Sequence, residues 1–182
     1  MLHTWVVMPT CLPTVLRRCH DCASGRFRAN GKFRVNAHHK ALDAWLLVLC
    51  AGCGQTAKLT VLERVTVRSV RPELLDRMHA NDPSLAAELL QNPVLLRRNR
   101  VALDWEGAWR LDTGGSDHLD AEVVDVSVRF AARIPVRPVR LIAEGCGLSR
   151  AEVERLIAEG GLVSAVRLNG RLTGDFTFTL KR

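Results

Sequence analysis

Two pairs of cysteines carry the clearest chemistry in this sequence. Cys19 and Cys22 form one Cys-x-x-Cys pair, Cys50 and Cys53 form a second, and residues 23–49 separate them. Two tight turns that each offer two thiolates can surround one zinc ion tetrahedrally. Four unrelated buried thiols would not explain this paired spacing. The sequence therefore predicts a structural Zn²⁺ site with these four cysteines as ligands.

A zinc ion held by four thiolates has no open coordination position, so its expected role is structural and not hydrolytic. The sequence contains no serine elbow and no His-Glu-x-x-His motif, and its acidic residues are scattered. Cys11 and Cys146 lie outside the two pairs, and we expect Cys11 to pack and not to bind metal. No catalytic residue is predicted, and the sequence favours a protein that is not an enzyme. An enzyme with a site between domains remains the less favoured alternative.

The segments around the cysteines read as antiparallel strands. Residues 32–37 alternate between apolar and polar side chains, residues 42–50 return as an apolar strand, and residues 59–67 form a third. His38 and His39 lie in the turn between the first two strands, at the far end from the cysteines, so we expect neither to bind zinc. Residues 1–70 are therefore predicted to form a zinc ribbon.

The rest of the chain mixes helices and strands, which makes the predicted fold class α+β. In residues 71–121, prolines open short helices and residues 101–104 and 109–112 read as a β-hairpin. In residues 122–182, Ser149 and Glu152 form a capping box at the start of a helix. Strands are expected at residues 123–134, 162–168 and 176–180. The prediction is three consecutive parts: a zinc ribbon, an acidic helical and hairpin middle, and a C-terminal module.

Several motifs of the first half resemble a family of bacterial domains of unknown function. They are an Arg-Arg-Cys-x-x-Cys knuckle over residues 17–22, Phe-Arg-Val-Asn-Ala at 33–37 and Leu-Asp-x-Trp-Leu at 42–46. A strand containing Trp5 precedes them. The resemblance covers most of the chain, and it implies no particular activity.

The C-terminal part is similar to the S-four RNA-binding fold, named after a small-subunit ribosomal protein. The similarity lies in the order of a helix, Leu148-Ser149-Arg150, a second helix, a strand, Asn169-Gly170 and a last strand. It implies a pair of helices whose arginines hold the backbone of a structured RNA. The residues that this resemblance assigns to RNA binding are Arg137, Arg140, Arg150, Arg155 and Arg171.

The charge of the chain fits a polyanionic partner. The net charge is +7, and residues 1–70 contain ten Lys and Arg against three Asp and Glu. Residues 71–128 are acidic and residues 129–182 are basic again. Basic surfaces attract nucleic acids, and on the polar face of the first hairpin the candidate RNA-binding residues are Arg34, His38 and Lys40. The alternative is a protein–protein adaptor that docks through the zinc ribbon without binding nucleic acid.

The predicted location is the cytoplasm. Cysteines with metal-ligand spacing suit a reducing compartment, and no apolar run is long enough to cross a bilayer. The predicted function is that of a zinc-stabilised RNA-binding protein, with ribosomal or transfer RNA, or the ribosome, as its partner.

Overall fold

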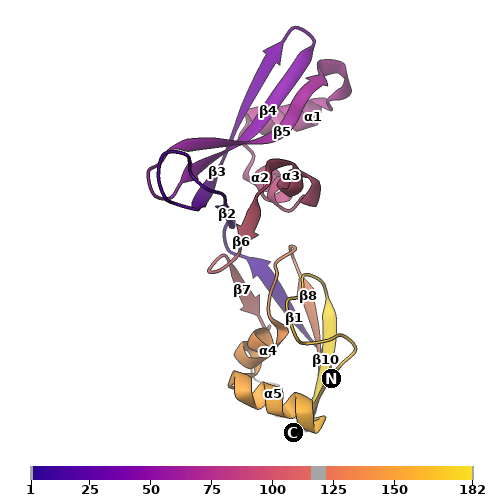
Figure 1. Cartoon of the computed structure of the whole chain (residues 1–182). Coiled ribbons are helices and arrows are strands. Elements are labelled where there is room, and N and C mark those ends of the chain that lie inside the picture. Colours follow the sequence, from indigo (N-terminus) through magenta and orange to yellow (C-terminus); the bar gives the residue numbers. More distant parts are fainter. Residues whose placement is uncertain (1, 116–121, 182) are drawn as a thin grey trace. The chain divides into compact units, whose positions relative to one another are not determined.

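The computed structural model describes residues 2–115 and 122–181. Within them the chain forms five α-helices and two five-stranded sheets, so the predicted α+β class is confirmed. The chain divides into two compact units. We call residues 12–106 the inserted unit, and residues 1–11 together with residues 107–182 the terminal unit (Figure 1).

The inserted unit is built on an antiparallel sheet in the order β5-β4-β3-β2-β6. Its strands are β2 (Thr14–Leu16), β3 (Arg26–His38), β4 (Ala41–Cys50), β5 (Thr56–Thr66) and β6 (Ala102–Asp104). Because β2 to β5 are neighbours in chain order, the β2–β3 and β4–β5 connections lie at the same end of the sheet. The β3–β4 turn lies at the opposite end.

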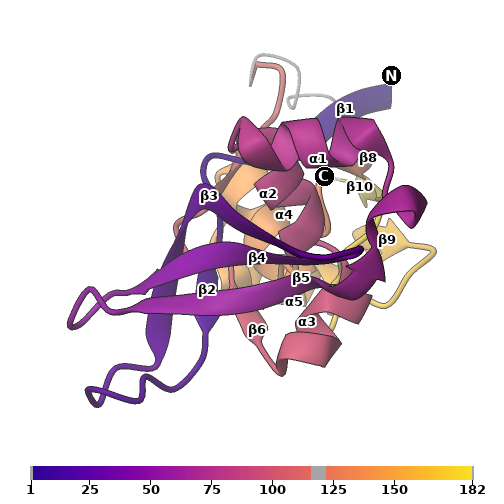
Figure 2. The same ribbon diagram turned by 90° about the horizontal axis from the view of Figure 1, so that it is seen from above.

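One face of this sheet is covered by helices α1 (Pro72–His79), α2 (Pro83–Leu90) and α3 (Pro93–Asn99) (Figures 1 and 2). Each helix has a proline at its first turn, where the missing N–H costs nothing. The inward-facing side chains of β4 are buried against α1 and α2. They include Ala44, Leu46 and Val48, which contact Met78, Leu85, Ala86 and Leu90 in two adjoining clusters.

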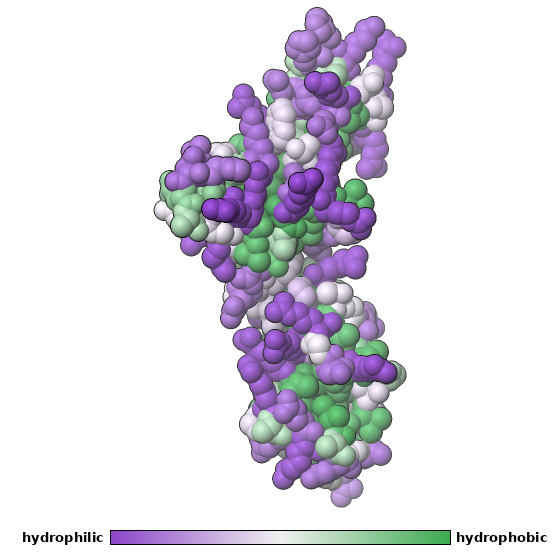
Figure 3. All heavy atoms as spheres, in the orientation of Figure 1, coloured by the Kyte–Doolittle hydropathy of each residue, from purple (hydrophilic) through white to green (hydrophobic). Residues whose placement is uncertain are grey.

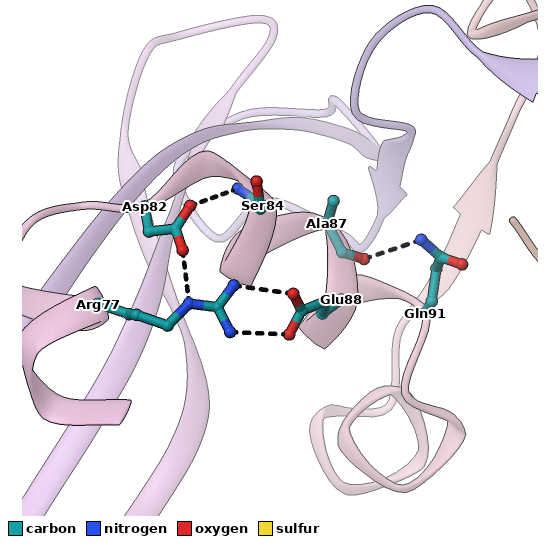
Figure 4. A network of polar contacts seen from close by, with 6 residues as sticks. All are labelled: Arg77, Asp82, Ser84, Ala87, Glu88 and Gln91. Carbon is teal, nitrogen blue, oxygen red and sulfur yellow. Dashed lines mark hydrogen bonds and ion pairs between the residues drawn. The ribbon is translucent and has the colours of Figure 1, made fainter. Parts of the chain in front are cut away.

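Arg77 joins α1 to α2 (Figure 4). Its guanidinium donates two hydrogen bonds to the carboxylate of Glu88, at 2.8 and 3.1 Å, and its Nε pairs with Asp82. Asp82 also caps α2 by accepting from the N–H of Ser84 at 2.8 Å. Glu88 first and Asp82 second raise the pKa of Arg77, which in turn lowers the pKa of both carboxyls. The role of Asp82 and Glu88 is therefore to hold the connection between α1 and α2 in place.

Two asparagines bond the backbone of the sheet. The side-chain amide of Asn99 accepts from the N–H of Thr60 at 2.7 Å and donates to its carbonyl at 3.0 Å. It thus occupies the position that a neighbouring strand would take at the edge of β5. Asn81 accepts from the N–H of Phe33 at 2.7 Å, where β3 departs from regular register. Helix α3 and the α1–α2 turn are tied in this way to the strands that carry the cysteines.

The terminal unit has a mixed sheet in the order β7-β1-β8-β10-β9, with β1 and β8 parallel. Its elements are β1 (Leu2–Pro9), β7 (Trp109–Asp112), β8 (Val123–Phe130), α4 (Pro138–Cys146), α5 (Arg150–Glu159), β9 (Leu162–Ser164) and β10 (Phe176–Lys181). The capping box of Ser149 and Glu152 opens α5 as predicted. None of the helices in the described part of the chain is long and apolar enough to cross a membrane.

The compact units do not follow the three predicted segments. The helices after residue 70 pack on the sheet that carries the cysteines, and β1 pairs with β7 and β8. The other predicted boundary, at residue 121, falls outside the described residues. The predicted hairpin of residues 101–112 is wrong, because β6 pairs with β2 in one unit and β7 pairs with β1 in the other. The strand predicted at 162–168 ends at Ser164.

Candidate metal centre

The first cysteine pair lies in the β2–β3 connection. The N–H of Arg17 bonds the carbonyl of Gly25 at 3.0 Å, and the N–H of Cys19 bonds the carbonyl of Ser24 at 2.9 Å. These bonds close a loop in which the N–H of Ser24 points at the sulfur of Cys22, 3.5 Å away. The loop therefore directs both sulfurs to one side.

The second pair lies in the β4–β5 connection and repeats this arrangement. The N–H of Cys50 bonds the carbonyl of Gln55 at 2.8 Å, and the N–H of Gly54 bonds the carbonyl of Cys50 at 2.9 Å. Gly54 has φ of 76°, a left-handed conformation that glycine adopts without strain. The N–H of Gly52 lies 3.4 Å from the sulfur of Cys50. Each pair thus has a backbone N–H aimed at one sulfur.

The four sulfurs meet at one end of the sheet, all within 4.8 Å of one another. The sulfurs of Cys19 and Cys53 are 3.7 Å apart, and those of Cys22 and Cys50 are 3.5 Å apart. A tetrahedral site with metal–sulfur bonds of about 2.3 Å separates its sulfurs by about 3.8 Å. The donor set and its spacing therefore fit a four-thiolate metal ion.

The pKa values of two thiols in the cluster shift in opposite directions, and a bound cation would allow all four thiols to ionise. The backbone N–H of Cys53, with that of Gly52 and the neighbouring sulfurs, lowers the pKa of Cys50 to about 6. The N–H of Gln55 lowers the pKa of Cys53, but desolvation and the three neighbouring sulfurs outweigh it and raise the value to about 12. Four sulfurs this close cannot all ionise unless a positive charge lies between them.

A family model described as a protein of unknown function, DUF1062, matches residues 35–168. This match covers most of the chain and includes the second cysteine pair. The chain belongs to the DUF1062 family. The predicted resemblance to a family of unknown function is therefore confirmed. No curated protein and no solved structure matches the chain.

The remaining site residues predicted for this DUF1062 protein are exposed and distributed over both units. In the inserted unit Arg34 lies on β3, and His38 and Lys40 flank the turn at the opposite end of the sheet from the sulfurs. The ring centroids of His38 and His39 are 4.4 Å apart. In the terminal unit the predicted arginines are on or near α4 and α5, and all are exposed: Arg137, Arg140, Arg150, Arg155 and Arg171.

The two cysteines outside the pairs also lie outside the sulfur cluster. Cys146 is the last residue of α4, and Cys11 is exposed. The expectation that Cys11 packs is therefore wrong. Gly52 also belongs to this site, although no sequence motif marks it: an added Cβ would lie 3.2 Å from the sulfur of Cys22 and 3.0 Å from the Cβ of Ser24.

Replacing Gly52 by alanine in this DUF1062 protein is expected to weaken metal binding about tenfold. The new methyl group presses on Cys22 and Ser24, so the first loop must move by a few tenths of an ångström and the tetrahedron distorts. Competition with a chromogenic chelator measures the affinity. Gly25→Ala is the matched control, because its Cβ meets nothing within 4 Å. Equal affinities for the two variants would contradict the prediction.

Proposed function

We propose that the four cysteines hold one structural Zn²⁺ and that the inserted unit is a zinc ribbon enlarged by three helices. The all-sulfur donor set and its tetrahedral spacing support zinc over harder cations. All six cysteines are free thiols. Because ligand thiols must stay reduced, this proposal places the protein in the cytoplasm.

We propose that the protein binds structured RNA, with ribosomal or transfer RNA as the candidate class. The observation that carries this proposal is the location of the charge. The inserted unit contains fifteen Lys and Arg against nine Asp and Glu, whereas the terminal unit contains eleven against ten. Nearly all of the net charge of +7 therefore belongs to the unit with the metal centre. The ion pairs of Arg26, Arg77 and Arg98 hold four of these nine carboxylates and use three of the fifteen cations.

The first hairpin is the main contact that we propose. Arg34, His38 and Lys40 are exposed along β3 and its turn. The neighbours of Arg34 on β3 pack on the core clusters, and the β3–β4 turn with His38 and Lys40 lies beyond those clusters. Arginine and lysine on such an arm reach phosphate oxygens without disturbing the core. Such contacts hold the RNA backbone in the duplexes of a structured RNA and in the loops between them.

The terminal unit supplies the second contact in this proposal. Its order of α4, α5, β9 and β10 agrees with the order expected of an S-four-like module. An open cavity of about 640 Å³ is lined by Arg137 and Arg167 together with Glu154 and Asn169. Glutamates alternate with the arginines on α4 and α5, among them Glu144, Glu152 and Glu159. We therefore assign Arg137, Arg140, Arg150, Arg155 and Arg171 a supporting role.

Binding of a labelled RNA hairpin is expected to weaken steeply with salt. Six to ten phosphate contacts correspond to a loss of about 10³–10⁵ in affinity between 50 and 200 mM salt. Fluorescence anisotropy with the zinc-loaded full chain measures this slope. The double variant R34Q/K40Q should lower both the affinity and the slope, because two phosphate contacts are removed.

The control is Arg110→Gln, which removes an exposed charge from the terminal unit. It should leave the affinity within about twofold of the unmodified protein. If the unmodified chain binds no RNA at low salt, the proposal fails and the protein–protein adaptor replaces it.

A further inference from the structure

The second face of the inserted unit's sheet differs in chemistry from the face under the helices. Along β4 the residues with even numbers are buried, and the residues with odd numbers are half-buried on the other face. Those residues include Trp45, Leu47 and Leu49. Figure 3 shows that apolar and hydrophilic side chains both reach the surface of this unit.

Trp45 occupies the middle of this face. It lies directly opposite Arg34 on β3 and opposite Thr60 on β5, so these side chains are immediate neighbours. The Nζ of Lys58 lies 4.7 Å from the centroid of the Trp45 ring. An aromatic ring is thus held between cationic groups contributed by the two flanking strands.

The cations of this face are available to a ligand. Arg28 lies opposite Leu49, four residues along β4 from Trp45, which places it about 13 Å from the row of Trp45. Among the described residues, no ion pair joins Arg28, Arg34 or Lys58 to a carboxylate. The two acidic residues of the face are engaged elsewhere. Asp43 accepts from the N–H of Arg64 at 2.8 Å, and Asp104 pairs with Arg26 at 2.9 Å.

We propose that this face binds an unpaired segment of RNA, with one base stacked on Trp45. We call it the stacking face, made of Arg28, Arg34, Trp45, Leu47, Leu49 and Lys58. The inference rests on the RNA binding proposed above and adds the form of RNA that the unit selects. A base in a duplex already has both faces covered, whereas an unpaired base can lie on an aromatic ring.

Lys58 lies where an incoming base can replace it on the Trp45 ring. A planar base covers more of the indole than an ammonium group does, so it displaces Lys58 from the ring. The freed ammonium group then meets the adjacent phosphate. Arg34, in the row of Trp45, contacts a phosphate beside the stacked base, and Arg28 contacts one further along the same side of the sheet. The aliphatic side chains of Leu47 and Leu49 cover the sugar edge. Charge and aromatic surface are therefore combined as in general single-strand binding sites.

The test compares two fluorescein-labelled probes, a twelve-nucleotide oligouridylate and a blunt RNA duplex of the same length, on the zinc-loaded full chain. We expect the single strand to bind more tightly than the duplex. Trp45→Ala should lower single-strand affinity about tenfold, the usual loss for one stacked base, and Trp45→Phe should retain most of it. The matched control is Trp109→Phe in the terminal unit, which should change nothing. Zinc content and circular dichroism establish that each variant is folded.

Quenching of tryptophan emission gives an independent measurement. Stacking of uridine on Trp45 should quench the emission of that residue. The Trp45→Phe variant lacks this emission and should not show the quenching, whereas the Trp109→Phe variant should show all of it. If the duplex binds as tightly as the single strand and Trp45→Ala alters neither, the inference is overturned while the proposed RNA binding stands. If neither probe binds at low salt, both fail, and a protein partner becomes the explanation for this face.

Discussion

Replacing Cys53 by serine is expected to abolish stoichiometric zinc binding and to unfold the inserted unit. Cys53 is exposed, so loss of its sulfur removes little packing, and the effect reports the metal. Structural zinc contributes on the order of 10–16 kcal/mol to the folding of small metal-bound domains. A typical domain has a free energy of unfolding of only about 5–15 kcal/mol. Three thiolates around a distorted site therefore cannot keep this sheet folded.

Elemental analysis measures the metal, and amide hydrogen exchange locates the unfolding. In the Cys53→Ser variant the protection of β3, β4 and β5 should be lost, while β1, β8 and β10 of the terminal unit stay protected. Cys11→Ser is the matched control, because Cys11 is also exposed and lies outside the sulfur cluster. A Cys53→Ser protein with one zinc ion per chain and unchanged protection would contradict the four-thiolate centre.

Replacing Gly145 by alanine is expected to destabilise the terminal unit by about 3 kcal/mol, at the upper end of overpacking effects. A Cβ at this position would overlap two ring atoms of Trp5. Trp5 is 1% exposed, and its ring packs edge-on against Phe178 at 5.4 Å, so the indole has nowhere to move. Helix propensity alone favours alanine by about 1 kcal/mol. A fall in the free energy of unfolding would therefore show that the overlap with Trp5 outweighs the helix propensity of alanine.

Thermal unfolding measures this effect. A loss of 3 kcal/mol corresponds to about 12–24 °C in Tm for a unit of this size. Gly174→Ala in the same unit is the control, because its Cβ meets nothing within 4 Å. The zinc content should be unchanged in both variants. A Gly145→Ala protein that unfolds at or above the temperature of the unmodified chain would show that the Trp5 ring can yield.

Local signals in the sequence located much of the secondary structure. The prolines at the first turns of α1 to α3 and the capping box of α5 act within a few residues, so the sequence specifies them without tertiary help. The two cysteine pairs are also local motifs. That they meet in space follows from the meander of β2 to β5, because consecutive antiparallel strands bring alternate turns to the same end.

The pairing of strands could not be read from the sequence in the same way. Residues 102–104 and 109–112 look like a hairpin, yet each strand pairs with a different sheet edge in a different unit. The alternation of apolar and polar residues specifies which side chains of a strand share a face. It does not specify which sheet edge that strand pairs with. The parallel pairing of β1 with β8 joins segments more than a hundred residues apart, and no local pattern encodes such a contact.

The sequence by itself determined the four clustered cysteines, the mixed α+β composition and the helix starts, because all three depend on residue type and short spacing. Tertiary structure alone decided that the basic residues 129–182 share a compact unit with acidic residues before them, so that the terminal unit is nearly neutral. It also decided that Gly52 lies against Cys22 and that Trp45 lies between Arg34 and Lys58. These relations depend on strand register and on contacts between distant segments. They arise only when the chain buries its apolar faces.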